Sequence, residues 1–152
     1  MECCRSVSKI ATTAMLLAVL AVTLPAIAGE RLVLIVSANS PIEQLDSLQV
    51  RKLFLGLTVT HGNDRLRPVL NESDARIKEV FLQNIVSMTD ITYDRSLLRL
   101  ALIEGQTRPR AYKDITALMA VLAGDPQAVS YAWEQDVARD PRIRVLRILW
   151  YD

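Results

Sequence analysis

The spacing of hydrophobic positions divides residues 29–152 into strands and helices. Arg31–Ser37 is an almost unbroken run of apolar, β-type residues, which predicts a buried strand in a sheet covered on both faces. Two shorter runs flank the turn residues 61–64 and predict a β-hairpin. The further strand segments predicted in this way are 58–60 and 66–70 of that hairpin, 128–132 and 143–150.

Helices are predicted where apolar residues recur at intervals of three and four positions. Ser47 is predicted to be the N-cap of a short helix that ends at Gly56, a residue type that commonly terminates helices. A second helix is expected after the polar residues 71–74. The apolar face of this second helix consists of Ile77, Val80, Phe81, Ile85 and Val86.

Two more helices follow before the C-terminal strands. The third begins at Thr89 or Asp90 and ends at Gly105, and the fourth is capped by Asp114 and ends at the sequence Gly-Asp-Pro. The third helix is expected to bury Ile91, Leu97, Leu98, Leu100, Ala101 and Leu102. The order of strand, helix, hairpin, three helices and two strands predicts a mixed α/β domain.

The first 28 residues have the pattern of an export signal. Arg5 and Lys9 precede an uncharged, leucine-rich segment that ends at Pro25. The small-x-small sequence at 26–28 then predicts cleavage before Gly29. The alternative is an uncleaved membrane anchor, but the apolar run is short for a membrane span. We therefore expect one exported domain, residues 29–152, after a signal peptide, residues 1–28.

Cysteine and charge content narrow the chemistry of residues 29–152. Both cysteines, Cys3 and Cys4, lie in the predicted signal, so the domain is expected to have no disulfide or thiolate site. Acidic and basic residues balance, which argues against a nucleic-acid partner. Most of the basic residues are arginine. Arginine suits planar oxyanions, although a GC-rich gene would produce the same excess.

Sequence patterns typical of enzymes are absent from this chain. There is no G-x-S-x-G elbow, no H-E-x-x-H pair and no G-x-x-x-x-G-K-[ST] loop. His61 is the only histidine, and one imidazole cannot form a zinc site. We therefore predict a non-catalytic protein with no metal and no cofactor.

Several short motifs occur in an order that points to a known family. They are F-L-G at 54–56, P-V-L at 68–70, V-F at 80–81, L-A-L-I-E-G-Q-T-R-P at 100–109 and A-V-S-Y-A at 128–132. In this order the chain resembles the short, single-domain relatives of phosphate ABC-transporter substrate-binding proteins. The resemblance implies an α/β fold like one lobe of a periplasmic binding protein, with a mixed sheet flanked by helices.

The resemblance also implies where a ligand would bind. In full-length phosphate binders the turn after the P-V strand is similar to R-S-D-G-S-G-T-T and holds the anion, whereas this chain reads N-E-S-D-A-R. A helix beginning near Ser73 would still direct backbone N–H groups at an anion. Alternatively, Ser73 or Asp74 only caps that helix. The candidate ligand-binding residues are Ser37, Ala38, Asn39, Ser73, Asp74, Ala75, Arg76 and Gln106.

Two functions are consistent with these features. The first is a periplasmic binding domain for a small oxyanion such as phosphate, working with an inner-membrane transporter or another envelope protein. In it, residues 37–39 and the basic loop of Gln106, Arg108 and Arg110 assist the turn at 73–76. The second is an envelope interaction or sensory module that keeps the fold without binding a ligand.

Overall fold

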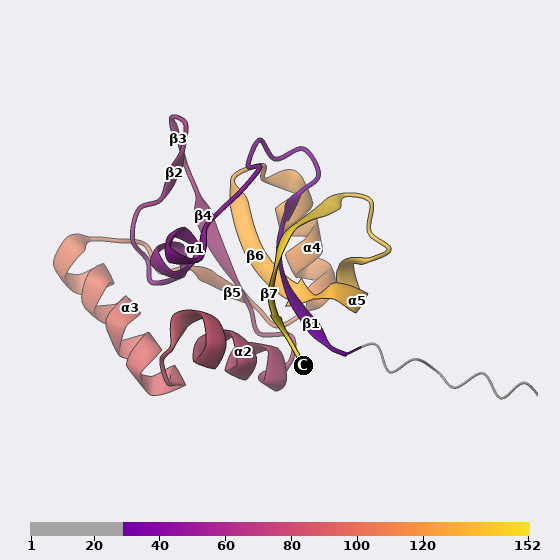
Figure 1. The fold of residues 1–152 in the computed structure, drawn as a ribbon. Helices are drawn as coiled ribbons and strands as arrows, with labels where there is room; N and C mark the ends of the chain where they lie inside the picture. Colours follow the sequence, from indigo (N-terminus) through magenta and orange to yellow (C-terminus); the bar gives the residue numbers. More distant parts are fainter. Residues whose placement is uncertain (1–28) are drawn as a thin grey trace, which may run out of the picture.

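The computed structural model describes residues 29–152, and the predicted signal peptide lies outside the described residues (Figure 1). This part of the chain forms a five-stranded sheet, a two-stranded hairpin, five α-helices and a π-helical turn. In chain order the elements are β1 (Arg31–Ser37), α1 (Ser47–Phe54), β2 (Thr60–His61), β3 (Asp64–Arg65), β4 (Arg67–Asn71), α2 (Ala75–Phe81), η1 (Leu82–Val86), α3 (Asp90–Glu104), β5 (Arg110–Tyr112), α4 (Ile115–Gly124), β6 (Ala128–Trp133), α5 (Glu134–Val137) and β7 (Ile143–Tyr151).

The sheet is mixed, as the family resemblance implied. Its strand order is β5-β4-β6-β1-β7. Strand β1 runs antiparallel to both β6 and β7, whereas β4 runs parallel to β6 and β5. The carboxyl ends of β4 and β6 therefore lie at the same edge of the sheet as the beginning of β1. This arrangement places the turn after β4 beside the first described residues.

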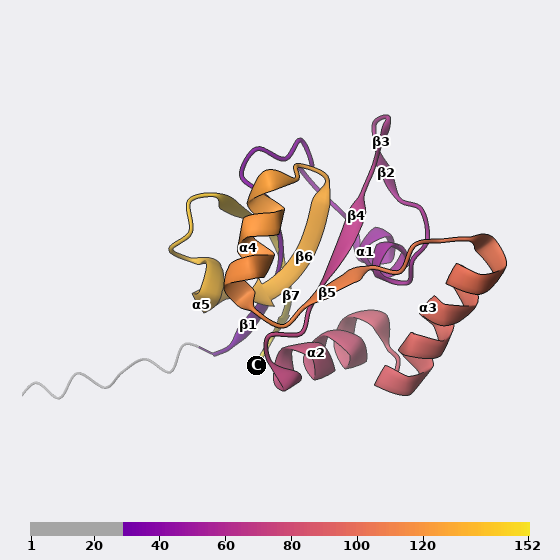
Figure 2. The same cartoon turned by 180° about the vertical axis from the view of Figure 1, so that it is seen from behind.

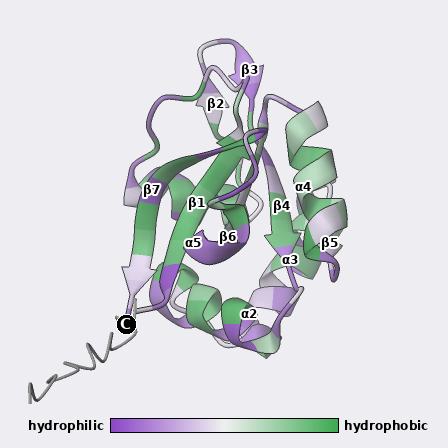
Figure 3. Ribbon diagram, turned by 90° about the vertical axis from the view of Figure 1, so that its right-hand side faces the viewer, coloured by the Kyte–Doolittle hydropathy of each residue, from purple (hydrophilic) through white to green (hydrophobic). Residues whose placement is uncertain are grey.

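Helices cover both faces of the sheet, which confirms the prediction made from the apolar run in β1. Leu32, Leu34 and Val36 belong to the larger core cluster, which α1, α2 and α3 cover. Val33 and Ile35 belong to a second cluster with side chains of α4 and α5. Successive side chains of a strand point to opposite faces, so one strand contributes to both cores. Figures 1 and 2 show these two groups of helices, and Figure 3 shows the hydrophobic character of the central strands.

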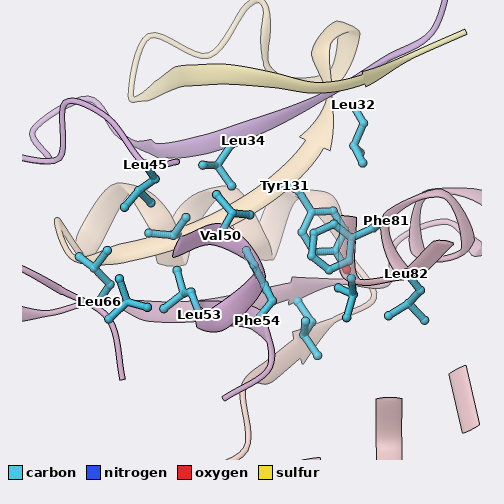
Figure 4. Packing of buried hydrophobic residues seen from close by; sticks show 14 of the residues in the cluster. Leu32, Leu34, Leu45, Val50, Leu53, Phe54, Leu66, Phe81, Leu82 and Tyr131 are labelled. Carbon is cyan, nitrogen blue, oxygen red and sulfur yellow. The ribbon is translucent and has the colours of Figure 1, made fainter. Parts of the chain in front are cut away.

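Three aromatic rings form the centre of the larger core. The rings of Phe81 and Tyr131 are stacked with centroids 3.7 Å apart, and Phe54 meets Phe81 edge-on at 4.8 Å (Figure 4). The Tyr131 hydroxyl donates to the backbone oxygen of Asn71 over 3.1 Å. Burial raises the pKa of Tyr131. The neutral hydroxyl is therefore a hydrogen-bond donor at any ordinary pH.

Several predicted boundaries differ from the structure. The N-cap of α1 is Asp46 rather than Ser47, because the Asp46 carboxylate accepts the N–H of Gln49 while the Gln49 side chain accepts the N–H of Asp46. The predicted hairpin forms at its tip, and Leu66, the first residue of its second leg, donates its backbone N–H to the oxygen of Val59 over 2.9 Å. Strands β2 and β3 pair around residues 62–63, whereas β4 joins the main sheet. Strand β5, which begins at Arg110 of the predicted basic loop, and the short helix α5 were not predicted.

The predicted buried face of α3 is wrong in part. Tyr93 and Leu97 are buried, but Ile91, Leu98 and Leu102 are exposed. Apolar residues lie around much of this helix, so their spacing alone does not select the inward side. A polar contact selects it instead. The Tyr93 hydroxyl donates to the backbone oxygen of Phe54 over 2.6 Å and directs this side of α3 to the core.

We expect Phe81→Ala to lower the free energy of unfolding by about 3–5 kcal/mol, because it removes the ring stacked on Tyr131 and leaves a cavity. Urea denaturation followed by circular dichroism measures this change. Leu48→Ala, at an exposed position of α1, is the control and is expected to stay within about 0.5 kcal/mol of the unmutated protein. Equal effects of the two substitutions would contradict the central role of the aromatic cluster.

Candidate functional site

The turn between β4 and α2 is organised by the buried side chain of Asn71. Its amide nitrogen donates to the backbone oxygen of Tyr131 over 3.0 Å. Its amide oxygen accepts the Ser73 backbone N–H over 3.0 Å and the Ser73 hydroxyl over 2.6 Å. Together with the bond from the Tyr131 hydroxyl, these contacts fix the exit of β4 against β6. The hydroxyl of Ser73, a candidate ligand-binding residue, already donates inside the turn.

Asp74 occupies the N-terminus of α2 with its own carboxylate. One carboxylate oxygen accepts the backbone N–H of Arg76 over 3.0 Å. The other accepts the indole N–H of Trp133 over 3.3 Å. Of the two interpretations for this turn, the structure therefore shows the cap, and Asp74 is the capping residue. A negative charge fixed at the helix N-terminus opposes the binding of a second anion there.

Arg76 is engaged with two carboxylates near the ends of the described chain. Its guanidinium lies 2.9 Å from a carboxylate oxygen of Glu30 and 3.4 Å from one of Asp152. It also lies 6.0 Å from the ring centre of Trp133, within range of a cation–π contact. Ala75, between Asp74 and Arg76, is the first residue of α2. The positive charge of Arg76 is thus already paired with two carboxylates of the same chain.

The other predicted site residues lie elsewhere. Ser37 ends β1 at the opposite edge of the sheet, where its buried hydroxyl donates to the backbone oxygen of Ala123 over 3.4 Å and accepts the N–H of Asn39. The N–H of Ala38 donates to the backbone oxygen of Arg142. Residues 37–39 and 73–76 therefore do not form one site. In Figure 1 the segment after β1 lies at the top of the molecule and α2 lies at the bottom.

Gln106 follows the C-terminal end of α3. This helix of 15 residues is about 22 Å long at 1.5 Å per residue, and its N-terminal end is the end that follows α2 and η1. The side chain of Gln106 accepts a hydrogen bond of 2.6 Å from the Arg65 guanidinium. Gln106 thus belongs to a third location, which brings the loop after α3 against β3.

At this third location arginine side chains surround a cavity of about 530 Å³. We call it the arginine cleft. Apolar residues, Leu53 and Val69 among them, also line it. Asp125 is the one acidic side chain in its lining. The basic lining residues are Arg65, Arg67, Arg108 and Arg110.

The four arginines of the cleft differ in how far they are neutralised. Arg67 contacts the Asp125 carboxylate at 2.5 Å, and Arg108 contacts Asp94 at 3.2 Å. Arg65 donates to the neutral amide of Gln106. Within residues 29–152, no hydrogen bond or ion pair engages the exposed Arg110 guanidinium. Two of the four positive charges are therefore without a carboxylate partner in the described part of the chain.

Sequence reasoning found part of this cleft and missed the rest. Gln106, Arg108 and Arg110 were identified as a basic loop. Arg65 and Arg67 were not included, because their approach to this loop depends on the pairing of β4 with β5. The sequence does contain a local signal for these two arginines. Arg65 and Arg67 are two positions apart, and side chains two apart in an extended chain point to the same side.

A second cavity, of about 680 Å³, lies between α2 with η1 and the beginning of α3. Its cation, Lys78, lies 2.8 Å from a carboxylate oxygen of Asp90 and 3.2 Å from one of Glu72. Burial acts to lower the pKa of Lys78, but the hydrogen bonds to these two carboxylates outweigh burial and raise it. Lys78 is therefore charged but already paired, which makes this cavity a poor site for anions.

Metal-binding and membrane-spanning features are absent from residues 29–152. No cluster of histidine, cysteine, aspartate and glutamate side chains with the arrangement of a metal site occurs there. None of the helices in this part is both long enough and apolar enough to cross a membrane.

Solved structures share the fold of this chain at low sequence identity. An ABC-type phosphate transport receptor from Vibrio cholerae superposes with a TM-score of 0.59 and 12% identity over 79% of this chain and 46% of the receptor. A Clostridium perfringens protein, assigned as a phosphate ABC-transporter substrate-binding protein and solved with bound phosphate, superposes with a TM-score of 0.57. The identity is 17%, and the match covers 79% of this chain and 45% of that protein. PstS from Borrelia burgdorferi superposes with a TM-score of 0.54 and 14% identity over 78% of this chain and 47% of PstS. Neither a protein-family model nor a curated protein matches the sequence.

These similarities identify the class of fold. The chain has the α/β fold of one lobe of a periplasmic binding protein, as the sequence resemblance implied. It spans about half the length of the phosphate-binding proteins that it matches.

We expect Asp74→Ala to lower the free energy of unfolding by about 0.5–2 kcal/mol, because the substitution removes the N-cap acceptor of α2. Guanidinium denaturation measures the change. Asp114→Ala is the matched substitution, since Asp114 caps α4 through two backbone N–H groups. No loss of stability in Asp74→Ala, together with a loss in Asp114→Ala, would show that the Asp74 carboxylate does not act as a cap.

Proposed function

We propose that this chain is an exported, non-catalytic binding domain of the cell envelope that holds a small oxyanion, such as phosphate, in the arginine cleft. The observation that carries the proposal is the gathering of four guanidinium groups around one cavity that has a single acidic lining residue. Guanidinium groups present several N–H donors in one plane and match the geometry of phosphate and sulfate.

The two arginines without a carboxylate partner are the main ligands in this proposal. Arg110 lies on β5 and Arg65 on β3, and both line the cleft. Gln106 holds Arg65 in place without neutralising it, because an amide carries no charge. The basic loop predicted from the sequence therefore keeps its proposed role, with Gln106 as a positioning residue instead of a direct ligand.

The same geometry indicates weak binding. All four arginines are exposed, and water and salt screen exposed charges. The described residues correspond to one lobe of the proteins that they resemble, and the cleft lies on the surface of that lobe. An open site of this kind suits sensing or low-affinity capture of an abundant anion.

Titration calorimetry with phosphate and sulfate at low ionic strength tests the proposal. Arg110→Ala and Arg65→Ala are each expected to weaken binding about tenfold or more, since a hydrogen bond to a charged group contributes about 1.5–3 kcal/mol. Arg139→Ala removes an equal charge from an exposed position outside the cleft and is the control. Arg76→Ala is also expected to have no effect. A loss of binding in Arg76→Ala alone would place the anion at the turn before α2.

The second candidate function is an interaction or sensory module without a ligand. The observation that favours it is the Asp74 carboxylate, which closes the position at the beginning of α2 where the resemblance places an anion. The two functions predict different results in the calorimetric experiment. Absence of any heat of binding up to millimolar phosphate and sulfate would support the interaction module and contradict the oxyanion site.

Export is proposed from the N-terminal sequence, and processing in a bacterial host tests it. Protein expressed from the full sequence is expected to appear in the periplasm with Gly29 as its first residue, as measured by intact mass. Ala28→Arg replaces the small residue at the cleavage site and is expected to retain residues 1–28. An intact N-terminus on the unmutated protein in the membrane fraction would instead show an anchor.

A further inference from the structure

The arginine cleft is larger than a bare phosphate or sulfate ion requires. Its volume is about 530 Å³. A phosphate ion fills about 150 Å³ even when each of its five non-hydrogen atoms is given the roughly 30 Å³ of a water molecule in the liquid. Cavities of about 300–1,000 Å³ are typical of sites for whole organic molecules. A bare oxyanion would therefore occupy only a small part of this cleft.

Much of the remaining lining of the cleft is aliphatic. Leu53 and Leu66 are buried, whereas Leu57 is 40% exposed and can contact a bound molecule directly. An inorganic anion gains nothing from such side chains, but an apolar group that leaves water beside them does. The leucine and valine residues that line the cleft are Leu53, Leu57, Leu66, Val69 and Val121.

The aliphatic lining follows from the short pairing between β4 and β5. Strand β5 pairs with residues 69–71 of β4 and not with the first two residues of that strand, Arg67 and Pro68. Pro68 has no backbone N–H, so this unpaired edge exposes no donor at that position. Side chains from both faces of the sheet therefore line one cavity, with Leu53 from the larger core cluster and Val69 from the second cluster.

The charges of the cleft define the head of the ligand. Arg65 and Arg110 have no carboxylate partner in the described part of the chain, and the other two arginines are paired with acidic side chains. Two positive charges match a phosphate monoester, because its phosphate group carries about −1.5 to −2 charge at pH 7. A carboxylate, with one negative charge, would leave one of the two arginines unmatched.

We propose that the arginine cleft binds an organic phosphate monoester, with its phosphate group at Arg65 and Arg110 and its apolar body against the aliphatic lining. The cleft has room for roughly a dozen non-hydrogen atoms beyond the phosphate group, at about 30 Å³ each. An ester of this size matches both the charged and the apolar part of the lining, whereas inorganic phosphate matches only the charged part. This proposal rests on the oxyanion site proposed above and names its class of ligand.

Titration calorimetry with inorganic phosphate and with methyl, butyl and hexyl phosphate at low ionic strength tests the proposal. The protein is expressed from the full sequence. Affinity is expected to rise about fourfold for each methylene that enters the cleft, because each buried methylene is removed from water. Hexanol has the same chain without the phosphate. It is expected to bind roughly a hundredfold more weakly than hexyl phosphate, since it lacks the charged hydrogen bonds to two arginines.

Two substitutions separate the apolar part of the site from its charged part. Leu57→Ser is expected to weaken the binding of hexyl phosphate about fivefold and that of methyl phosphate much less, because only the longer chain contacts the lining. Arg110→Ala is expected to weaken all four phosphates to a similar degree. Leu48→Ser, at an exposed leucine of α1 outside the cleft, is the matched control and is expected to change none of them. Circular dichroism verifies that each variant retains the fold.

The outcomes distinguish this proposal from the oxyanion site on which it rests. Equal affinities across the series, with binding still lost in Arg110→Ala, would overturn the organic ligand and keep the oxyanion site. Absence of binding for every phosphate would overturn both. A gain with chain length that Leu57→Ser leaves unchanged would also contradict the proposal. So would binding to vesicles that contain phosphatidic acid without any gain across the soluble esters, because the apolar body would then lie in a bilayer.

Discussion

The reciprocal bonding between Asn71 and Tyr131 is the constraint on which the rest of the structure depends. The Tyr131 hydroxyl bonds the backbone of Asn71, and the Asn71 side chain bonds the backbone of Tyr131. These two bonds join β4 to β6 beyond the point where their backbone pairing ends. The Tyr131 ring then stacks on Phe81 of α2. One pair of residues thus couples the sheet, the turn after β4 and the helix that covers the core.

The turn before α2 and the arginine cleft differ in how far their polar and positive groups are already engaged within the chain. At the turn, the polar groups are drawn into local bonds, and the carboxylate of Asp74 supplies the negative charge that a helix N-terminus favours. At the cleft, the arginines come from separate segments that meet only through the sheet, and their acidic partners are fewer. Arginine side chains without a carboxylate partner in the described residues therefore remain at the arginine cleft, beside strands β4 and β5.

The sequence predicted elements better than it predicted their relative placement. The run in β1 and the spacing of Ile77 and Phe81 reflect burial directly, so those elements and their cores could be predicted. The exposed side of α3 could not be, because apolar residues lie on two of its sides and the bond of Tyr93 decides which faces inward. The candidate site residues were separated for a related reason. Antiparallel pairing of β1 with β6 places Ser37 and Ser73 at opposite edges, and strand direction is not encoded in local spacing.

The position of Arg76 has a consequence for how the domain can be attached to other molecules. This side chain joins Glu30 to Asp152, and the backbone N–H of Asp152 donates to the oxygen of Glu30 over 3.1 Å. The first and last described residues therefore leave the domain side by side, at the edge of the sheet near α2. Joining them would yield a circular permutant with little distortion. A tether at either end leaves the opposite edge, where the segment after β1 lies, facing away from the point of attachment.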